Sequence, residues 1–146
     1  MDALDVRDLT THFFMHEAVA RAVENVSFTL KKGEMLGLAG ESGCGKSVTA
    51  LTIMRLIPDP PGKITQGEII FGGTNLLTLS EAEMRKIRGR SISMIFQEPM
   101  TSLNPVFQIG DQISEVLQLH EGMSRKEAWN RSVEMLKMVG IPAPER

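Results

Sequence analysis

Apolar and polar residues alternate along two stretches near the start of the chain. Leu4–Leu9 and Ala22–Leu30 both show this pattern, which is typical of strands with one buried face. The sequence Lys31–Glu34, "KKGE", is a turn signal directly after the second stretch. We therefore predict a pair of antiparallel strands at the beginning of the fold.

Segments with more continuous apolar character follow. Glu34–Gly40 and Ser91–Phe96 are short and almost continuously apolar, which predicts two strands buried on both faces. Gly67–Gly73 reads as a further strand with glycines at both ends. Gly45–Ile57 is nearly all apolar after its lysine and stops at Pro58, so it is predicted to be a buried helix.

The second half of the chain contains several helix signals. Serine and glutamate stand three residues apart at Ser80–Glu83 and at Ser124–Glu127, the spacing of a capping box, and the first of these pairs predicts a short helix toward Ile87. Two later helices are expected to bury apolar faces, made of Ile109, Ile113, Val116 and Leu117 and of Trp129, Val133, Leu136 and Val139. The expected organisation is an α/β part over residues 1–98 and a helical part over residues 99–146.

Composition adds few constraints. The 146 residues are enough for one domain, and 42% hydrophobic with 23% charged residues is ordinary for a globular protein. A net charge of −2 gives no reason to expect a nucleic-acid partner. The single cysteine, Cys44, has no internal disulfide partner, which fits a reducing compartment such as the cytosol.

The candidate chemistry lies in "GESGCGKS", which matches the phosphate-loop pattern G-x-x-x-x-G-K-[ST]. Glycines let consecutive backbone N–H groups point at phosphate oxygens, and the following helix directs its positive end at the same anion. The lysine reaches the β- and γ-phosphates, and the serine hydroxyl is a ligand for Mg²⁺. The residues expected to hold the nucleotide are Gly40, Ser42, Gly43, Cys44, Gly45, Lys46, Ser47 and Val48.

Cys44 stands inside this loop and has two interpretations. It is either a small side chain tolerated where the backbone binds the phosphates, which we favour, or a reactive thiol. A reactive thiol predicts that alkylation blocks nucleotide binding and that bound nucleotide protects the thiol.

Two segments together suggest a family. "GESGCGKSVTALTIMRL" followed by "MIFQEPMTSLNPVF" closely resembles the ATP-binding subunits of bacterial ABC importers, in particular the oligopeptide, dipeptide, nickel and glutathione group. The resemblance extends over essentially the whole chain. It implies a P-loop ATPase fold (here its N-terminal portion) with an antiparallel β element and the start of a helical subdomain.

The resemblance also implies roles for single residues. Gln97 matches the family's Q-loop glutamine, whose amide contacts Mg²⁺ and the attacking water, and Glu98 is then a neighbour and not the catalytic acid. Phe13 best matches the aromatic ring that stacks on adenine, with Phe14 as the second choice and core packing as the alternative for both. Part of the segment from Pro99 to Gln108 is expected to contact the permease.

Other family elements do not occur in these 146 residues: the serine-glycine-glycine signature, the acidic strand end with its glutamate, and the switch histidine. His120 is interpreted as a helix-end or surface histidine, and His12 and His16 as residues near the nucleotide edge or on the surface. The family pairs two ATP-binding subunits head to tail, so a partner chain would supply only the signature.

Two functional hypotheses follow. The first is an ATP-binding subunit at the cytoplasmic face of the inner membrane, peripheral to its transmembrane permease, that couples ATP and Mg²⁺ to import of a peptide or a related small solute. Nickel and glutathione are the alternatives to peptide. The second is a nucleotide-binding fragment that does not hydrolyse ATP. An unrelated P-loop enzyme such as a small kinase is disfavoured by "QEPMTSLNP".

Overall fold

The computed structural model of the chain describes residues 2–97 and 102–145. These residues form two compact units, 1–84 and 85–146, each of which is described by itself. The elements in chain order are β1 (Asp2–Phe14), β2 (Val19–Lys31), α1 (Lys46–Ile53), β3 (Gly62–Phe71), β4 (Thr74–Asn75), the 3-10 turn η1 (Leu76–Thr78), α2 (Glu81–Ile87), α3 (Ile109–Glu121) and α4 (Arg125–Met138). The predicted division at residue 98 stays a prediction.

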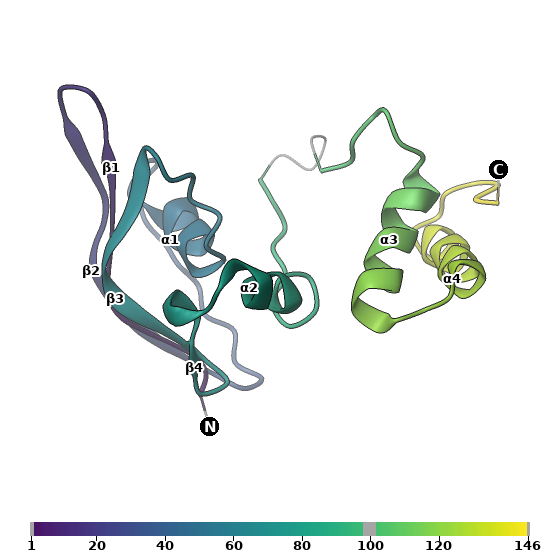
Figure 1. Cartoon of the computed structure of the whole chain (residues 1–146), viewed down its shortest axis with the longest axis horizontal. Helices are drawn as coiled ribbons and strands as arrows, with labels where there is room; N and C mark the ends of the chain where they lie inside the picture. The colour runs from purple at the N-terminus through teal and green to yellow at the C-terminus, as the bar shows by residue number, and fades with distance from the viewer. Residues whose placement is uncertain (1, 98–101, 146) are drawn as a thin grey trace. The chain divides into compact units, whose positions relative to one another are not determined.

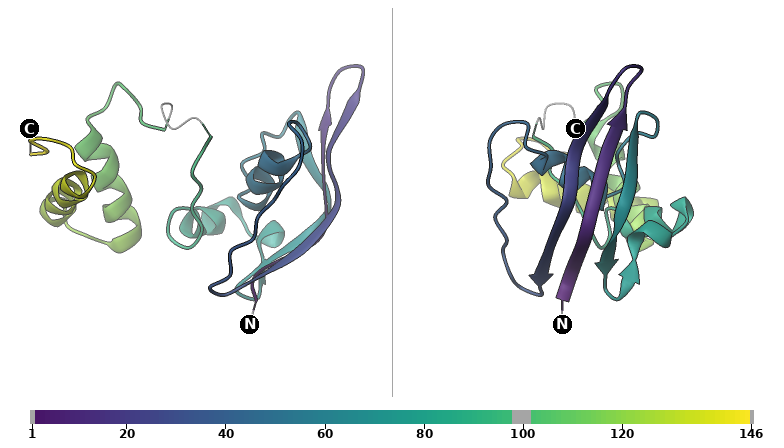
Figure 2. Two further views of the ribbon diagram at one scale, coloured as in Figure 1. Left: turned by 180° about the vertical axis from the view of Figure 1, so that it is seen from behind. Right: turned by 90° about the vertical axis from the view of Figure 1, so that its left-hand side faces the viewer.

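The first unit is built on an antiparallel sheet with the strand order β2-β1-β3-β4 (Figure 2). Val6 of β1 faces Phe28 on β2 and Ile69 on β3, so β1 is paired along both edges. The predicted antiparallel pair is confirmed, although both strands are longer than the alternating stretches indicate. The extra length passes through bulges, where Asp8 and Asn25 have positive φ angles of 46° and 49°.

Strand β3 begins five residues before the predicted start at Gly67. Gly67 does not end the strand but lies within it, at φ +107°, next to the bulge in β1. A β-carbon there would be 2.6 Å from the Arg7 carbonyl oxygen and 2.8 Å from that of Asp8. The glycine is therefore needed for close backbone approach, and interpreting it as a strand boundary was wrong.

Helix α1 lies against one face of this sheet (Figures 1 and 2). It ends at Ile53, four residues earlier than predicted, because Arg55 adopts a left-handed conformation at φ +51°. Arg55 N–H donates to Thr52 O (2.9 Å) and Leu56 N–H to Leu51 O (2.8 Å), which is a Schellman motif. The buried apolar residues of this unit are Val6, Leu9, Val23, Ile53, Met54, Ile69, Leu76 and Met84.

Two predicted buried strands are not formed. Glu34–Gly40 and Ser91–Phe96 are irregular apart from a single bridge between Arg88 and Ile92. Met35 is 97% exposed and Ile95 is 94% exposed. An apolar run becomes a strand only when a neighbour supplies the ladder hydrogen bonds, and neither segment has a paired strand within residues 2–97 and 102–145. The two buried strands predicted from these runs are therefore absent from the described part of the chain.

The second unit contains α3 and α4. The capping box is confirmed, since Ser124 Oγ accepts from Glu127 N–H while Glu127 accepts from Ser124 N–H, and Ser80 and Glu83 make the same pair at α2. The expected apolar faces are only partly buried: Leu117 is buried, whereas Ile109, Val116 and Val139 are 47%, 49% and 73% exposed. The helices instead meet through small side chains: Ser114 Oγ lies 3.0 Å from Ser132 Oγ, and Ala128 on α4 is buried.

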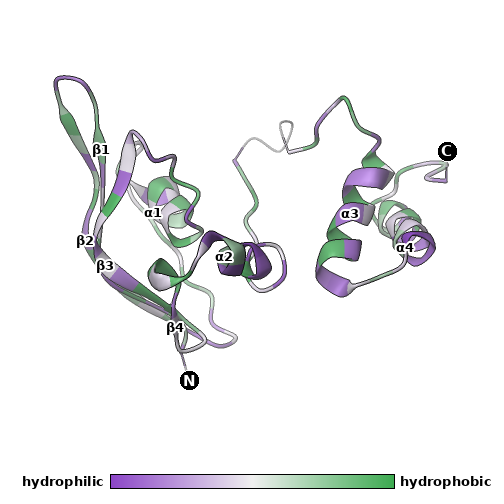
Figure 3. Ribbon diagram, in the orientation of Figure 1, coloured by the Kyte–Doolittle hydropathy of each residue, from purple (hydrophilic) through white to green (hydrophobic). Residues whose placement is uncertain are grey.

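Figure 3 shows hydrophobic residues on the strands and helices of both units and also in the irregular segments. No helix among the described residues is both long enough and apolar enough to cross a lipid bilayer.

Candidate functional site

The predicted phosphate loop precedes α1, and glycine conformations shape it. Gly43 and Gly45 have φ angles of +83° and +93°, in the left-handed region that favours glycine. Gly45 is the N-cap residue of α1, and a β-carbon on it would overlap the carbonyl oxygen of Ala22 on β2. The loop therefore packs directly on the sheet at the point where the helix begins.

The N-terminus of α1 is open to an anion. No side chain caps it, and its first turn contains no acidic residue. The first N–H groups of a helix carry a partial positive charge and lack carbonyl partners within the helix. This end of α1 is consequently suited to phosphate binding, as the loop motif predicts.

Lys46 lies over the loop rather than away from it. Its Nζ donates to the carbonyl oxygens of Gly40 (2.8 Å) and Glu41 (2.6 Å) and lies 3.3 Å from Cys44 Sγ. The loop thus concentrates one ammonium charge next to the open helix end. An ammonium group beside a positive helix end favours a polyanionic ligand.

Cys44 has an exposed thiol in contact with Lys46. A β-carbon on Gly40 would be 2.6 Å from Cys44 Sγ, so the glycine also makes room for the sulfur. Both interpretations of Cys44 stay predictions.

The neighbouring residues are accessible to a ligand in different ways. Ser42, Gly43 and Ser47 are exposed, whereas Val48 is half-buried in the first turn of α1. The described residues contain no cluster of three or more His, Cys, Asp or Glu side chains that would hold a metal ion. Mg²⁺ fits this site if it takes one hydroxyl from Ser47 and its other ligands from phosphates and water.

The aromatic candidates lie at the end of β1. Phe13 is half-buried, and its ring fits beside Gly62, where a β-carbon would be 3.0 Å from Phe13 Cε1. Phe14 is 48% exposed, with its ring centroid 6.3 Å from that of His12. His12 Nε2 is 3.0 Å from Glu24 Oε1, and His16 is exposed in the turn between β1 and β2. Adenine stacking stays a prediction for both phenylalanines.

Two further candidate residues, Gln97 and His120, belong to the second unit. Gln97 is exposed and follows the irregular segment, and its role beside Lys46 stays a prediction. Glu98 and the beginning of the proposed permease segment, residues 99–101, lie outside the described residues. His120 is in the last turn of α3, where its Nε2 would be 3.0 Å from a β-carbon on Gly89, which agrees with a helix-end histidine.

The structure adds features that the sequence analysis did not identify. Thr11 and Thr52 form a buried contact between β1 and α1, and Arg55 Nη1 donates to the carbonyl oxygens of Leu76 (3.1 Å) and Leu79 (2.6 Å). A polar threonine within an apolar helix pattern was the available signal for Thr52.

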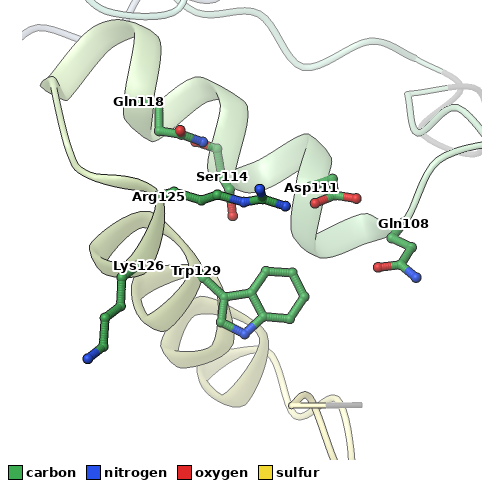
Figure 4. Close-up of a pocket in the computed structure, with 7 residues that line it drawn as sticks. All are labelled: Gln108, Asp111, Ser114, Gln118, Arg125, Lys126 and Trp129. Atoms are coloured by element: carbon green, nitrogen blue, oxygen red, sulfur yellow. The ribbon is translucent and has the colours of Figure 1, made fainter.

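A groove between α3 and α4 was also not predicted. It has a volume of about 600 Å³, and Figure 4 shows Arg125 and Trp129 extending from α4 toward α3. It is lined by Gln108, Asp111, Ser114, Gln118, Arg125, Lys126 and Trp129. None of the residues predicted to bind nucleotide lines it.

Comparison with known proteins gives a consistent result. Residues 23–145 match the model of the ABC transporter family. The chain is 58% identical over 143 residues to the probable peptide ABC transporter ATP-binding protein y4tR of Sinorhizobium fredii, covering 98% of this chain and 43% of that protein. It is 52% identical over 143 residues to the oligopeptide transport ATP-binding protein OppD of Bacillus subtilis, covering 98% of this chain and 40% of that protein.

Solved structures show the same relationship. The dimeric structure of a post-hydrolysis state of the ATP-binding cassette MJ0796, bound to ADP and Pi, matches this chain with a TM-score of 0.78 and 30% sequence identity. The match covers 92% of this chain and 56% of the cassette. The chain thus spans less than half the length of these two curated relatives and about half of this cassette. The predicted fold class, part of a P-loop ATPase cassette with an antiparallel element, is confirmed. This chain belongs to the ATP-binding proteins of the ABC transporter family.

Proposed function

We propose that this chain binds ATP together with Mg²⁺ through the loop Gly40–Ser47, as the nucleotide-binding part of an ATP-binding subunit of a peptide importer. The observation that carries the proposal is the loop itself. Gly45 packs on the Ala22 carbonyl and brings the open end of α1 beside the Lys46 ammonium. A positive helix end and a positive side chain at one place suit a triphosphate.

Each part of the loop has its own task in this proposal. The backbone N–H groups at the start of α1 hold phosphate oxygens, and Lys46 exchanges its bonds to the Gly40 and Glu41 carbonyls for bonds to the β- and γ-phosphates. Ser47 offers its exposed hydroxyl to Mg²⁺. The metal, when bound with ATP, neutralises phosphate charge.

Two further residues complete the proposed site. Phe13 stacks on adenine from the end of β1. Gln97 contacts the Mg²⁺ ion and the attacking water, and its loop reports the nucleotide state to the permease. Both roles derive from the resemblance of the sequence to ABC importers.

Peptide is the proposed solute, with nickel and glutathione as alternatives. Several relatives support it by name, including the dipeptide transport ATP-binding protein DppD of Haemophilus influenzae. The proposed partners are transmembrane permease subunits and a second ATP-binding subunit in a head-to-tail dimer, at the cytoplasmic face of the membrane. The dimeric structures of the MJ0796 cassette support the second partner.

For these 146 residues assayed by themselves, we propose nucleotide binding without measurable hydrolysis. Family ATPases use an acidic residue after a buried strand to orient water, and the resemblance assigns no residue of this sequence to that role. A steady ATPase rate that Lys46→Ala abolishes would contradict this proposal.

Calorimetric titration with MgATP tests the binding step. Wild type is expected to bind, and Lys46→Ala is expected to weaken binding by at least about tenfold, because a charge-assisted contact to phosphate is lost. Lys32→Ala, an exposed lysine in the turn after β2, is the matched control and should bind as wild type does. Equal affinities of Lys46→Ala and wild type would refute the proposed site.

Uptake of a labelled dipeptide by membrane vesicles tests the import step. The vesicles contain the permease and the whole ATP-binding subunit of which this chain is proposed to be the nucleotide-binding part. Uptake should require ATP and be lost in Lys46→Ala. Uptake of nickel or glutathione instead of the dipeptide would correct the solute, and uptake that ignores the lysine would refute the coupling.

A further inference from the structure

A short chain of buried hydroxyl groups joins β1 to α1. Thr11 Oγ1 lies 3.1 Å from Thr52 Oγ1, and both residues are fully buried at 0% exposure. Thr52 Oγ1 also donates to the Val48 carbonyl oxygen at 2.7 Å, one turn earlier in α1. The sequence of contacts therefore runs from the strand to the first turn of the helix.

The direction of these bonds follows from the number of protons. Each hydroxyl carries one donor, and the carbonyl of Val48 only accepts. Since the Thr52 hydroxyl donates its single proton to the Val48 carbonyl oxygen, the Thr11 hydroxyl must be the donor in its bond to Thr52 Oγ1. Among residues 2–97 and 102–145 the Thr11 hydroxyl has no other hydrogen-bond partner, so loss of the Thr52 oxygen leaves a buried donor unsatisfied. An unsatisfied buried donor destabilises the protein by more than the bond itself contributes.

The two ends of this series of hydrogen bonds lie next to the two parts of the proposed nucleotide site, the phosphate loop and the end of β1. Val48 directly follows Lys46 and Ser47, and Thr11 stands two residues before Phe13 on the same strand. Apolar contacts between a helix and a sheet have little directionality. Hydrogen bonds require short distances and favourable angles, so they fix one position of the helix along the strand. The hydroxyl chain therefore sets where the first turn of α1 lies along β1.

We infer that Thr11 and Thr52 are positioning residues for the nucleotide. They hold the phosphate loop and the end of β1 in one fixed relation, so that ATP meets a preorganised site. This inference rests on the proposed ATP binding at Lys46 and Ser47.

The second unit contains a matched control. Ser114 Oγ lies 3.0 Å from Ser132 Oγ, which donates to the Ala128 carbonyl at 2.8 Å. This buried pair has the same chemistry, with a hydroxyl that bonds both a neighbouring element and the carbonyl one turn back. Ser132→Ala thus reports what the loss of such a pair does to stability alone.

The test measures the MgATP dissociation constant and the melting temperature of the same samples. Thr52→Val keeps the side-chain shape and is expected to weaken ATP binding about three- to tenfold, the range expected for one or two buried hydrogen bonds. Thr52→Ser keeps the hydroxyl and should restore near wild-type affinity. Thr11→Val should have a smaller effect, because the bond from Thr52 to Val48 remains.

The double variant Thr11→Val/Thr52→Val should bind no more weakly than Thr52→Val, because it also removes the orphaned Thr11 donor. Ser132→Ala should lower the melting temperature without changing ATP affinity. If wild type binds ATP and folded Thr52→Val binds equally well, the positioning inference is wrong and the proposed function stands. If wild type binds no ATP, the proposed function fails first and the inference fails with it.

Should Thr52→Val not fold, Thr52→Ser and Thr11→Val still decide the matter. Affinity that is unchanged in Thr11→Val would overturn the inference. A reduced affinity in Thr11→Val, together with wild-type affinity in Thr52→Ser, would support it.

Discussion

The carbonyl oxygen of Ala22 on β2 occupies the space in which a side chain at Gly45 would begin. Gly45 also has a φ angle of +93°, so both its backbone conformation and its surroundings require glycine. Gly43, in the same loop, has a similar φ of +83° but has open space where its β-carbon would be.

This difference predicts that Gly45→Ala and Gly43→Ala have unequal effects. Gly43→Ala should lower the free energy of unfolding by about 1 kcal/mol, because alanine disfavours the left-handed conformation. Gly45→Ala should cost at least about 2 kcal/mol more, because a backbone carbonyl cannot move aside as a flexible side chain does. Chemical denaturation of the two variants measures the difference, and equal free energies of unfolding would show that the Ala22 contact has no consequence.

Arg55 is predicted to stabilise the first unit despite its unfavourable backbone. Arg55→Gly relieves the left-handed conformation, worth about 1 kcal/mol, but removes the bonds from Nη1 to the Leu76 and Leu79 carbonyls. The net result should be a loss of about 1–3 kcal/mol, since hydrogen bonds from charged groups are the stronger ones.

Gly140 supplies the comparison for Arg55. It occupies the same position in a Schellman motif at the end of α4, at φ +78°, with Ile141 N–H donating to Leu136 O at 3.0 Å. Gly140→Ala should lower the free energy of unfolding by only about 1 kcal/mol. Thermal melts measure both variants, and an Arg55→Gly protein more stable than wild type would contradict the assigned bonds.

Alkylation of Cys44 is predicted to interfere with nucleotide binding through space, whatever the reactivity of the thiol. A group added to Sγ would stand where Lys46 Nζ now lies at 3.3 Å. N-ethylmaleimide treatment should therefore lower MgATP affinity in wild type, and ATP should slow the modification. Cys44→Ser should bind ATP normally and resist the reagent. Full affinity after complete alkylation would contradict the predicted steric interference and would also exclude a thiol-gated site.

The capping box of α4 predicts a dependence on acid. Bonds from the Ser124 hydroxyl and then from its backbone N–H lower the pKa of Glu127 below its ordinary value. A lowered folded-state pKa means that the stabilisation is present above the unfolded pKa of about 4.3 and is lost as pH falls through the folded value. Helicity of α4 should thus decline below about pH 4.

Circular dichroism between pH 6 and pH 2 measures this decline. Glu127→Gln keeps an acceptor at the same position without a titrating group, so its contribution to the acid transition should disappear. Identical acid transitions in wild type and Glu127→Gln would show that the Ser124 bonds do not stabilise the charged carboxylate.

Local signals in the sequence predicted the parts of the fold that neighbouring residues control. The antiparallel pair, the capping boxes at Ser80 and Ser124, and the loop before α1 were all identified, because turn residues, cap spacing and glycine positions act over a few residues. The errors at Glu34–Gly40 and Ser91–Phe96 have a common cause. Apolar composition indicates that a segment favours burial, but a strand needs a partner that the segment itself does not encode.

The sequence alone was enough to identify the family and to predict the chemistry of the phosphate loop, since both depend on residue types at fixed spacing along the chain. Tertiary structure decided what those residues contact. Only the fold shows that Gly45 is confined by Ala22 while Gly43 is not, that Gly67 lies inside a strand, and that Thr11 reaches Thr52 across 41 positions. Such contacts depend on the register of distant elements, which no local pattern records.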